Sequence, residues 1–256
     1  AYPATSSTID RIEFSSDTQN TVVRGPLSIA RNRGAATGNS NFGYFGGGYA
    51  PGNSSTIDRI DYSNDSANAS NRCLLTLARR DFSATGNQNF GYFGGGTPGV
   101  SSVDRLDYSN DTQTSSVRGP LSSGRGSSAV TGNNNFGYIG GYGDPGQFST
   151  VNRLDYTNDT QTASVRGPLS SARYETAASS SQAYGGAPNT TVDPLPSYIR
   201  AATKWIDSNT LDLPFKRVLG SYGYFYGGIT YSNIHRIDFS NDTTLVTRPI
   251  LTANLS

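Results

Sequence analysis

The chain lacks methionine altogether and holds one cysteine, one histidine and one tryptophan among its 256 residues. A single cysteine excludes an internal disulfide and leaves no cysteine cluster for a metal. No apolar run approaches the roughly 18 residues that a transmembrane helix needs, and the opening residues AYPATSST are not typical of a signal peptide. We therefore expect no membrane partner.

The chain also lacks an excess of charge of either sign. The 20 basic residues nearly balance the 19 acidic ones, which gives a net charge of +1. Because nucleic-acid binding leaves a basic patch or stripe, we expect no nucleic-acid partner. What the chain does have is glycine (30), tyrosine (16) and phenylalanine (11), so the aromatic residues must supply much of the core.

One aromatic and glycine-rich phrase recurs along the chain. NFGYFGGG stands at 41–48 and again at 89–96, NFGYIGG follows at 135–141, and YGYFYGG stands at 222–228. A catalytic glycine loop is needed once, so a phrase that recurs indicates architecture. A glycine loop that binds phosphate also requires a following helix, whereas turn residues and a predicted strand follow here.

A second phrase sets the period of the repeat. STIDRIEF at 7–14 returns as STIDRIDY, SSVDRLDY and STVNRLDY, weakens to TTVDPLPSY, and ends as NIHRIDF. Its aliphatic anchors are separated by 48, 46, 48, 41 and 42 residues, and they are Ile9, Ile57, Val103, Val151, Val192 and Ile234. Periods of roughly 40–50 residues are typical of β-propeller blades.

Each unit predicts four short strands. The first is the stretch at 28–39, the second is FGYFGGG, the third is TIDRIDY and the fourth resembles TASVRGPLS, with a polar SNDT turn before it. Ile12 and Phe14 are two residues apart and share one strand face, so we expect Ile12→Asp to destabilise the fold strongly. We expect the arginine and the second acidic residue of each IDR phrase, such as Arg11 and Glu13, to pair along or across strands.

The unit resembles the kelch β-propeller repeat, in which a strand ends in Gly-Gly and an arginine opens the next unit. The matching glycines are Gly46, Gly47, Gly94, Gly95, Gly140, Gly141, Gly185, Gly186, Gly227 and Gly228, and the arginines are Arg31, Arg79, Arg125 and Arg173. The resemblance implies an all-β fold, a propeller of about six blades with four antiparallel strands each. It covers residues 1–256 as one domain, in which 174–222 diverge most. The usual kelch tryptophan is absent, because Trp205 is the only one.

The phrasing of the units also resembles virion proteins of tailed phages that infect marine cyanobacteria. That resemblance implies a structural protein of a virion, extracellular in location, such as a tail fibre, appendage or decoration. Its partners would be other virion proteins or further copies of itself.

The phase of the repeat predicts a missing half blade. The third-and-fourth strand pair occurs six times, whereas the first-and-second pair occurs five times. We expect the polypeptide to continue past Ser256 and to complete the ring. The alternative is closure by another chain.

Candidate sites for chemistry are few. A metal centre needs several imidazole or thiolate ligands, and only His235 and Cys73 are present, so we expect no metal and no cofactor. Galactose-oxidase-type chemistry is excluded for the same reason. A glycosidase needs two carboxylates in different environments at one place, whereas the acidic residues here recur in every unit, so we expect no enzymatic activity.

Binding residues are expected where the repeats differ. The loops after the diglycines carry Tyr49, Tyr142 and Phe148, and the divergent segment carries Lys204 and Trp205. Aromatic residues on loops suit contacts with protein or carbohydrate. The leading hypothesis is therefore a structural or binding propeller, and the alternative is a lectin-like adhesin that binds host surface polysaccharide.

Overall fold

The chain is all-β in the part that the computed structural model describes, which is residues 4–16, 18–141, 146–173, 176–180, 222–226, 234–238 and 245–248. Tyr142, Lys204, Trp205, Gly185, Gly186, Gly227 and Gly228 lie outside these ranges. Within them, no helix is long and apolar enough to cross a membrane.

Four sheets have four antiparallel strands each, and one sheet has two. Sheet 1 consists of β1 (Ile9–Arg11) and β2 (Val22–Arg24). Sheet 2 consists of β3 (Ala35–Gly38), β4 (Phe42–Ala50), β5 (Gly52–Asp61) and β6 (Ser70–Leu74). Sheet 3 consists of β7 (Ser83–Gly86), β8 (Phe90–Gly94), β9 (Val103–Asp107) and β10 (Ser116–Arg118).

Sheet 4 consists of β11 (Ala129–Gly132), β12 (Phe136–Gly140), β13 (Val151–Asp155) and β14 (Ser164–Arg166). Sheet 5 consists of β15 (Ala177–Ser180), β16 (Tyr222–Tyr226), β17 (Ile234–Asp238) and β18 (Leu245–Arg248). In every four-stranded sheet the strands are hydrogen-bonded in chain order. The predicted four-strand unit is therefore confirmed, and sheet 1 contains only the third and fourth strands of such a unit.

Sheet 5 corrects the expected division into repeats. The sequence phrases predict a separate repeat that contains Gly185 and Gly186 and is anchored at Val192. In the structure β15 pairs instead with β16, in the register Ala177↔Tyr226. The physical reason is that YGYFY matches the aromatic second strands of the other sheets better than the segment directly after β15 does. The first two strands of sheet 5 are therefore separated by residues 181–221.

The hairpins between first and second strands follow from a repeated asparagine. Asn39 ends the AATGN phrase, and its side-chain oxygen accepts hydrogen bonds from the backbone N–H groups of Asn41 and Phe42, both at 2.9 Å. Asn87 and Asn133 make the same pair of bonds in sheets 3 and 4. An asparagine that bonds its own backbone two residues on fixes a tight turn, so the sequence phrase sets the register of each hairpin.

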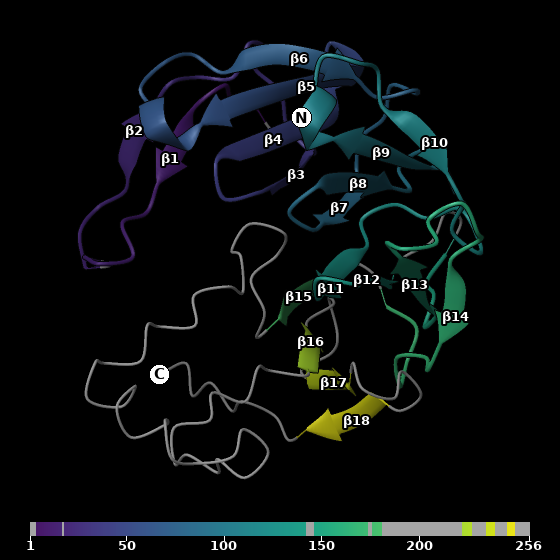
Figure 1. Cartoon of the computed structure of the whole chain (residues 1–256). Helices are drawn as coiled ribbons and strands as arrows, with labels where there is room; N and C mark the ends of the chain where they lie inside the picture. The colour runs from purple at the N-terminus through teal and green to yellow at the C-terminus, as the bar shows by residue number, and fades with distance from the viewer. Residues whose placement is uncertain are drawn as a thin grey trace, which may run out of the picture.

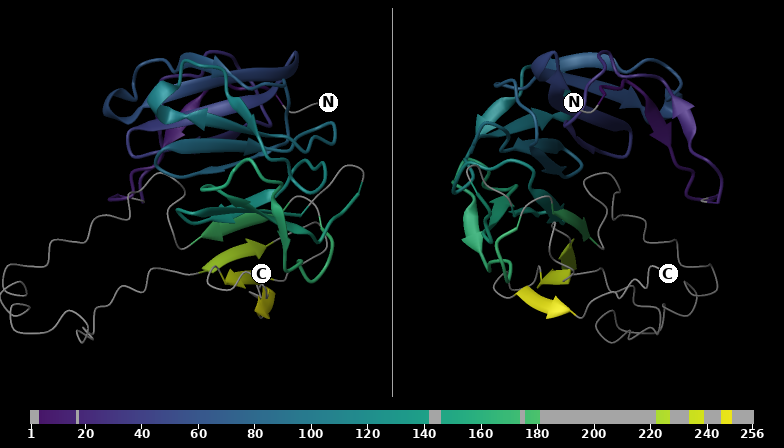
Figure 2. Two further views of the ribbon diagram at one scale, coloured as in Figure 1. Left: turned by 45° about the vertical axis from the view of Figure 1, so that its right-hand side comes forward. Right: turned by 180° about the vertical axis from the view of Figure 1, so that it is seen from behind.

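The sheets follow one another in a curved row (Figures 1 and 2). Their first strands β3, β7, β11 and β15 contact one another in turn. Sheet 1 lies at one end of the row and sheet 5 at the other (Figure 1). The described sheets do not form a closed ring.

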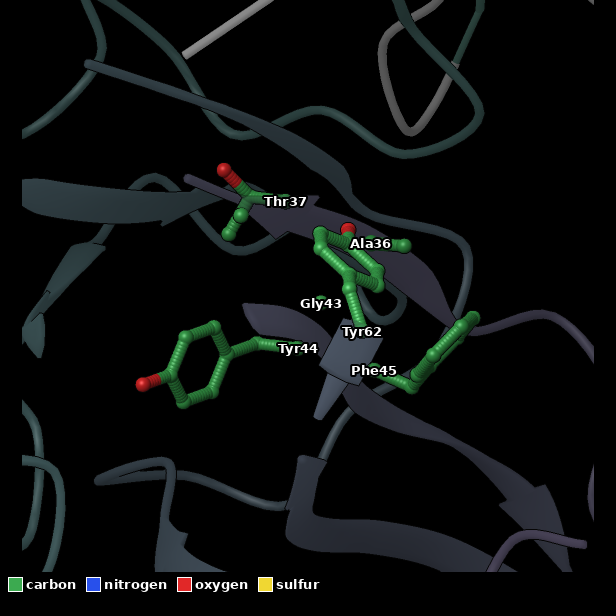
Figure 3. Close-up of a pocket in the computed structure, with 7 residues that line it drawn as sticks. Ala36, Thr37, Gly43, Tyr44, Phe45 and Tyr62 are labelled. Carbon is green, nitrogen blue, oxygen red and sulfur yellow. The ribbon is translucent and has the colours of Figure 1, made fainter. Parts of the chain in front are cut away.

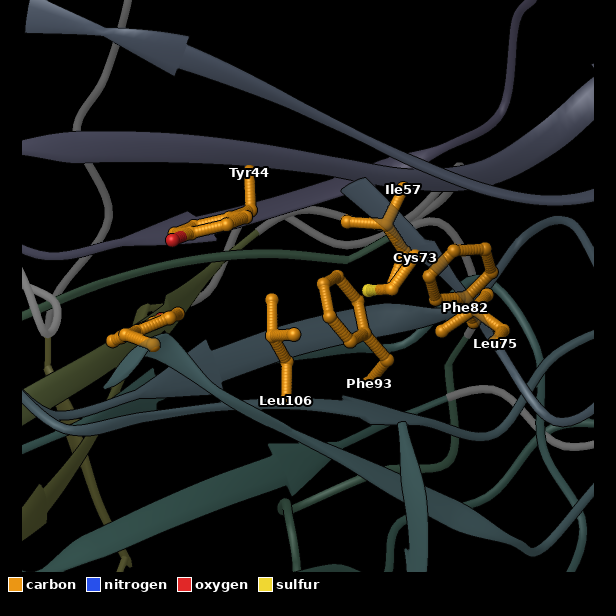
Figure 4. Packing of buried hydrophobic residues seen from close by; sticks show 8 residues of the cluster. Tyr44, Ile57, Cys73, Leu75, Phe82, Phe93 and Leu106 are labelled. Atoms are coloured by element: carbon orange, nitrogen blue, oxygen red, sulfur yellow. The ribbon is translucent and has the colours of Figure 1, made fainter. Parts of the chain in front are cut away.

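The hydrophobic core is divided into clusters between successive sheets. The cluster between sheets 2 and 3 is built from eight buried side chains, seven of which Figure 4 labels, and they are Tyr44, Ile57, Cys73, Leu75, Phe82, Phe93, Leu106 and Tyr108. Two further clusters repeat this arrangement along the row. Each sheet therefore buries its faces against its neighbours, as stacked repeat units do.

Sheet 1 departs from this pattern. Leu106 and Tyr108 are buried in sheet 3, but the equivalent Ile12 and Phe14 are 56% and 90% exposed. The expectation that Ile12 is a core residue is therefore wrong. The reason is that sheet 1 has no first and second strands in the described residues against which Ile12 could pack.

The repeated glycines allow close contact between sheets, as expected for glycines at the end of a strand. A Cβ atom on Gly46 would lie 2.8 Å from the ring of Phe93 in the next sheet, and one on Gly140 would lie 3.1 Å from the ring of Phe225. In the three described pairs the second glycine has a positive φ, which is 50° at Gly47, 78° at Gly95 and 90° at Gly141. Glycine adopts this conformation without the steric cost that other residues meet.

Candidate functional site

One aspartate joins sheets 2 and 3 through three side chains. Asp111, in the turn between β9 and β10, accepts hydrogen bonds from the hydroxyl of Tyr44 at 2.9 Å and from Nη1 of Arg59 at 2.8 Å. Arg72 binds the other carboxylate oxygen through Nε at 3.0 Å and Nη2 at 2.8 Å. The ring of Tyr44 also stacks on Tyr108, with centroids 4.8 Å apart.

This cluster perturbs the pKa values of its members. Burial acts to raise the pKa of Asp111, but the hydrogen bonds from Arg72 and Tyr44 outweigh it and hold the pKa below its usual value. Burial, followed by the bond to Asp111, raises the pKa of Tyr44. Asp111 is therefore a fixed carboxylate at neutral pH, and Tyr44 is a fixed hydrogen-bond donor.

The same arrangement recurs one sheet further along. Asp159 accepts from Tyr92 at 2.9 Å and from Arg105 at 2.9 Å, and its carboxylate lies 3.3 Å from Nε of Arg118. Tyr92 stacks on Tyr156 with centroids 5.0 Å apart. We call each such set, an aspartate with two arginines and a tyrosine of the preceding sheet, an inter-sheet clamp.

The clamps correct the expected pairing of charges in part. Nη2 of Arg11 lies 3.8 Å from the carboxylate of Glu13, as expected, but the arginines of sheets 2 and 3 have other partners. Asp61 and Asp107 accept instead from the backbone N–H groups of Ser63 and Ser109, each at 2.9 Å. The arginines Arg59 and Arg105 reach the aspartate of the next sheet because that carboxylate is buried and offers stronger, less solvated bonds.

Between sheets 1 and 2 the clamp is incomplete. Asp65 accepts from Arg11 at 2.8 Å, and its carboxylate lies 3.2 Å from Nε of Arg24. No tyrosine among the described residues binds Asp65. The second strand of sheet 1, which would carry that tyrosine, is the element that the described structure lacks.

The arginines of the kelch resemblance are all buried, but their partners differ. Arg31 pairs with Asp58 at 2.9 Å, and Arg79 pairs with Asp104 at 3.2 Å. The equivalent partner of Arg125 is Asn152, which has no charge. Arg125 is 1% exposed, its guanidinium donates to the backbone oxygen of Thr150 and to the hydroxyl of Ser123, and burial lowers its pKa to about 10.

Asn152 preserves the connection that Asp104 makes, although it loses the charge. In sheet 3 Asp104 accepts from the backbone N–H and the hydroxyl of Thr76, at 2.8 and 2.7 Å. In sheet 4 Asn152 accepts from the N–H of Ser122 at 2.7 Å and donates to the hydroxyl of Ser122 at 2.9 Å. The hydroxyl of Ser122 accepts a hydrogen bond where that of Thr76 donates one. The segment that carries this hydroxyl is therefore held in the same way in both sheets.

Of the two described aromatic residues that were expected on loops, Tyr49 lies in a strand and Phe148 lies in the segment between β12 and β13. Tyr49 belongs to β4 and is half-buried, with the guanidinium carbon of Arg80 5.3 Å from its ring centroid. Phe148 is also half-buried, bridges to Arg173, and has Arg125 5.9 Å from its ring centroid. The expectation that Tyr49 lies on a loop is wrong, because β4 and β5 extend their pairing to Ala50↔Gly52.

Cys73 lies in the core between sheets 2 and 3. Burial raises the pKa of its thiol to about 12, so the reactive thiolate is scarce at neutral pH. The described residues hold no group of three or more His, Cys, Asp or Glu side chains that could bind a metal ion. His235 lies on β17, where its backbone is in register with Phe225 and Thr247.

Two hollows open beside sheet 2, on the face of β3 and β4 that points toward sheet 1. One, of about 250 Å³, is lined by Ala36, Thr37, Gly38, Gly43, Tyr44, Phe45 and Tyr62 (Figure 3). The other, of about 220 Å³, is lined by Leu27, Arg31, Asn32, Arg33, Gly34, Ala35, Ala36, Phe45 and Gly46. Neither lining includes a carboxylate, so neither offers the acid pair that glycoside hydrolysis requires.

The hollows lie where the other sheets have close packing. Phe45 lines both of them, whereas the equivalent residues Phe93, Ile139 and Phe225 are buried against glycines of the preceding sheet. Tyr62 is 49% exposed, whereas its equivalent Tyr108 is 8% exposed. Nothing in the sequence of sheet 2 itself predicts this difference, because the cause is the incomplete neighbour.

Comparisons with known proteins add no family. No protein-family model matches the chain, and no curated protein matches it.

Proposed function

We propose that this chain is a kelch-like β-propeller that serves as a non-enzymatic structural or binding component of a phage virion, such as a tail fibre, an appendage or a decoration protein. It would act outside the cell, in contact with other virion proteins or with further copies of itself. Its mechanism would be rigid display of the loops at the edges of its sheets.

The observation that carries the proposal is the repetition of one contact set between successive sheets. Asp111 and Asp159 each fix two arginines and a tyrosine of the preceding sheet. Charges that recur at successive interfaces and are already paired serve to hold sheets together, which favours a structural role for them over a catalytic one. The contacts between consecutive first strands favour a propeller, since these strands then line a common centre.

Peptide mapping of purified phage particles tests the proposal. If the chain is a virion component, its tryptic peptides will be found in washed, intact particles at a constant ratio to the capsid protein. Peptides found only in the soluble fraction of infected cells would contradict the proposal.

The adhesin alternative gives a different result. An adhesin binds surface polysaccharide as an isolated chain, whereas an assembly protein does not. Binding of the purified chain to immobilised host polysaccharide, lost on competition with the free polysaccharide, would favour the alternative.

A further inference from the structure

Among the described residues, β1 pairs only with β2, so its other backbone edge is the one that the complete sheets use to bind a second strand. In sheets 2, 3 and 4, the tyrosine of the second strand pairs with the arginine of the third, as Tyr92 pairs with Arg105. The matching position in β1 is Arg11, whose side chain is 45% exposed compared with 22% for Arg105. In the complete sheets this arginine also covers a phenylalanine of the second strand, with Arg105 4.3 Å from the ring centroid of Phe90.

The face of sheet 2 provides a second set of unused contacts. Tyr108 and Tyr156 each carry two partners from the preceding sheet, a stacked tyrosine ring and a threonine hydroxyl. The threonine bonds are Thr37 to Tyr108 at 3.0 Å and Thr85 to Tyr156 at 2.6 Å. The equivalent Tyr62 lines the larger hollow, and sheet 1 offers it neither partner in the described residues.

The glycines of sheet 2 complete the pattern. Gly91 and Gly137 each face the methyl group of a threonine from the preceding first strand, 2.6 and 2.7 Å from where a Cβ atom would lie. Their equivalent Gly43 faces the hollow. Phe93 of sheet 3 packs against Gly46 of sheet 2. In the described residues, Phe45 has no equivalent glycine of sheet 1 against it.

We propose that sheet 1 and the adjoining face of sheet 2 form a docking site for a β-hairpin that carries the repeat's own T-G-N-x-N-F-G-Y-F-G-G phrase, supplied by a second polypeptide. Its tyrosine stacks on Tyr62 and donates to Asp65, which completes the third inter-sheet clamp. Its threonine binds the hydroxyl of Tyr62 and packs over Gly43. The glycine that follows its second phenylalanine packs against the ring of Phe45. The hairpin adds to β1 by strand addition, with main-chain hydrogen bonds for affinity and these side chains for specificity.

The inference rests on the propeller proposal, because it takes sheet 1 to be the outer half of a four-stranded unit. The choice of occupant follows from complementarity that the other interfaces show in full. An unrelated strand could form the backbone bonds, but only this phrase supplies the tyrosine, the threonine and the glycine at the required positions.

Titration of the full 256-residue chain with a labelled peptide of residues 35–47, AATGNSNFGYFGG, tests the inference. We expect saturable one-to-one binding by fluorescence anisotropy and a rise of Tm with peptide concentration, because the ligand binds only the folded chain. A peptide of the same composition in scrambled order should not bind. Absence of binding by the native-order peptide would overturn the inference.

Matched variants locate the site. Tyr62→Phe should weaken peptide binding by about fivefold to tenfold, since it removes one hydrogen bond from the interface. Tyr156→Phe makes the same change in a sheet that already has its partners, so it should lower Tm and leave peptide affinity unchanged. Equal peptide affinities for the two variants would contradict docking at Tyr62.

A change in the peptide tests the clamp itself. Replacing its tyrosine with phenylalanine should weaken binding to the parent chain by about fivefold to tenfold but have little further effect on an Asp65→Ala variant, because both changes remove the same bond. Fully additive effects would overturn the proposed contact.

Two further outcomes are distinguishable from these. A chain that dimerises without peptide, through a contact that Tyr62→Ala abolishes, would support the site and identify the second polypeptide as another copy of this chain. Loss of peptide binding by a chain that is still found in intact virions would overturn this inference alone and leave the proposed function standing.

Discussion

The hydroxyl of Tyr44 donates to the carboxylate of Asp111 over 2.9 Å, although the two residues belong to different sheets. The bond is one of four that end on this carboxylate, and the other three come from Arg59 and Arg72. Each member of the cluster is thus held by a partner from the neighbouring unit. The stability of this fold therefore depends on the interfaces between sheets, as is typical of repeat proteins.

Asp111→Asn should lower the free energy of unfolding by about 3 kcal/mol, because it leaves two arginines beside a neutral amide in a buried site. Chemical denaturation of parent and variant measures the loss. The matched control is Asp107→Asn, which affects only a local bond to Ser109 in the same sheet and should cost about 1 kcal/mol or less. Equal losses in the two variants would show that the clamp is not a major source of stability.

Truncation of equivalent aliphatic residues should separate complete from incomplete interfaces. Leu106 is fully buried, so Leu106→Ala should cost about 3 kcal/mol through lost contacts and a cavity. Ile12 occupies the same position in sheet 1 but is exposed, so Ile12→Ala should change stability by less than about 0.5 kcal/mol. A large loss at Ile12 would mean that sheet 1 already has its missing strands in solution.

The local structure could be predicted from the sequence because each repeat contains the residues that set its own turns and close contacts. Asn39 and its equivalents fix the hairpin turns, and glycines such as Gly46 stand where a ring from the next sheet approaches. These signals act within one unit or at a fixed offset from it. They are therefore visible in the spacing of the phrases alone.

The contacts between units could not be predicted in the same way. The recurrence of Arg59 and Asp111 shows that both matter, but the phrase does not reveal that they meet across two sheets. The exposure of Ile12 depends on strands that its own sequence does not contain. The pairing of Ala177–Ser180 with Tyr222–Tyr226 spans a segment in which the repeat weakens, so spacing alone assigned the wrong partner.

Asn152→Asp should stabilise the chain by about 1–3 kcal/mol, because it gives the buried Arg125 the carboxylate that Arg31 and Arg79 already have. The hydroxyl of Ser122 can donate to the new carboxylate, just as Thr76 donates to Asp104. Thermal and chemical denaturation measure the gain.

The reverse change in the neighbouring sheet is the control for this prediction. Asp104→Asn removes the carboxylate from Arg79 and should cost about 3 kcal/mol. A loss of stability on Asn152→Asp as well would show that burial of the extra charge outweighs the ion pair.

Stability should fall as the pH rises above about 9. Burial raises the pKa of Cys73 from 9.0 to about 12, and it raises the pKa values of Tyr44, Tyr92 and Tyr108 above their usual value of 10.0. The unfolded chain therefore loses these protons first. The stabilisation is complete below pH 9 and declines above it, by up to about 1.4 kcal/mol per group for each pH unit between the unfolded and folded pKa values.

The buried Arg125 acts in the opposite direction, because its folded pKa of about 10 lies below the usual 12.5. Its cost is relieved only as the pH rises past 10. Burial lowers the pKa of Arg79 as well, so two arginines oppose the thiol and the three tyrosines. Denaturation curves at pH 7, 9, 10 and 11 should therefore show a net decline. Tyr92→Phe removes one titrating hydroxyl, so its curve of stability against pH should fall less steeply than that of the parent, and an equal slope would contradict the assignment.

The thiol of Cys73 should resist modification in the folded chain. Because the thiol is buried beside Ile57 and Phe93 and its pKa is about 12, a disulfide reagent at pH 8 should label it only as fast as the structure opens. Labelling in denaturant should be complete within the mixing time and serves as the control. If the folded chain reacts as fast as the denatured one, the interface between sheets 2 and 3 is open in solution, and the packing of Tyr44 against Tyr108 cannot be the contact that holds it.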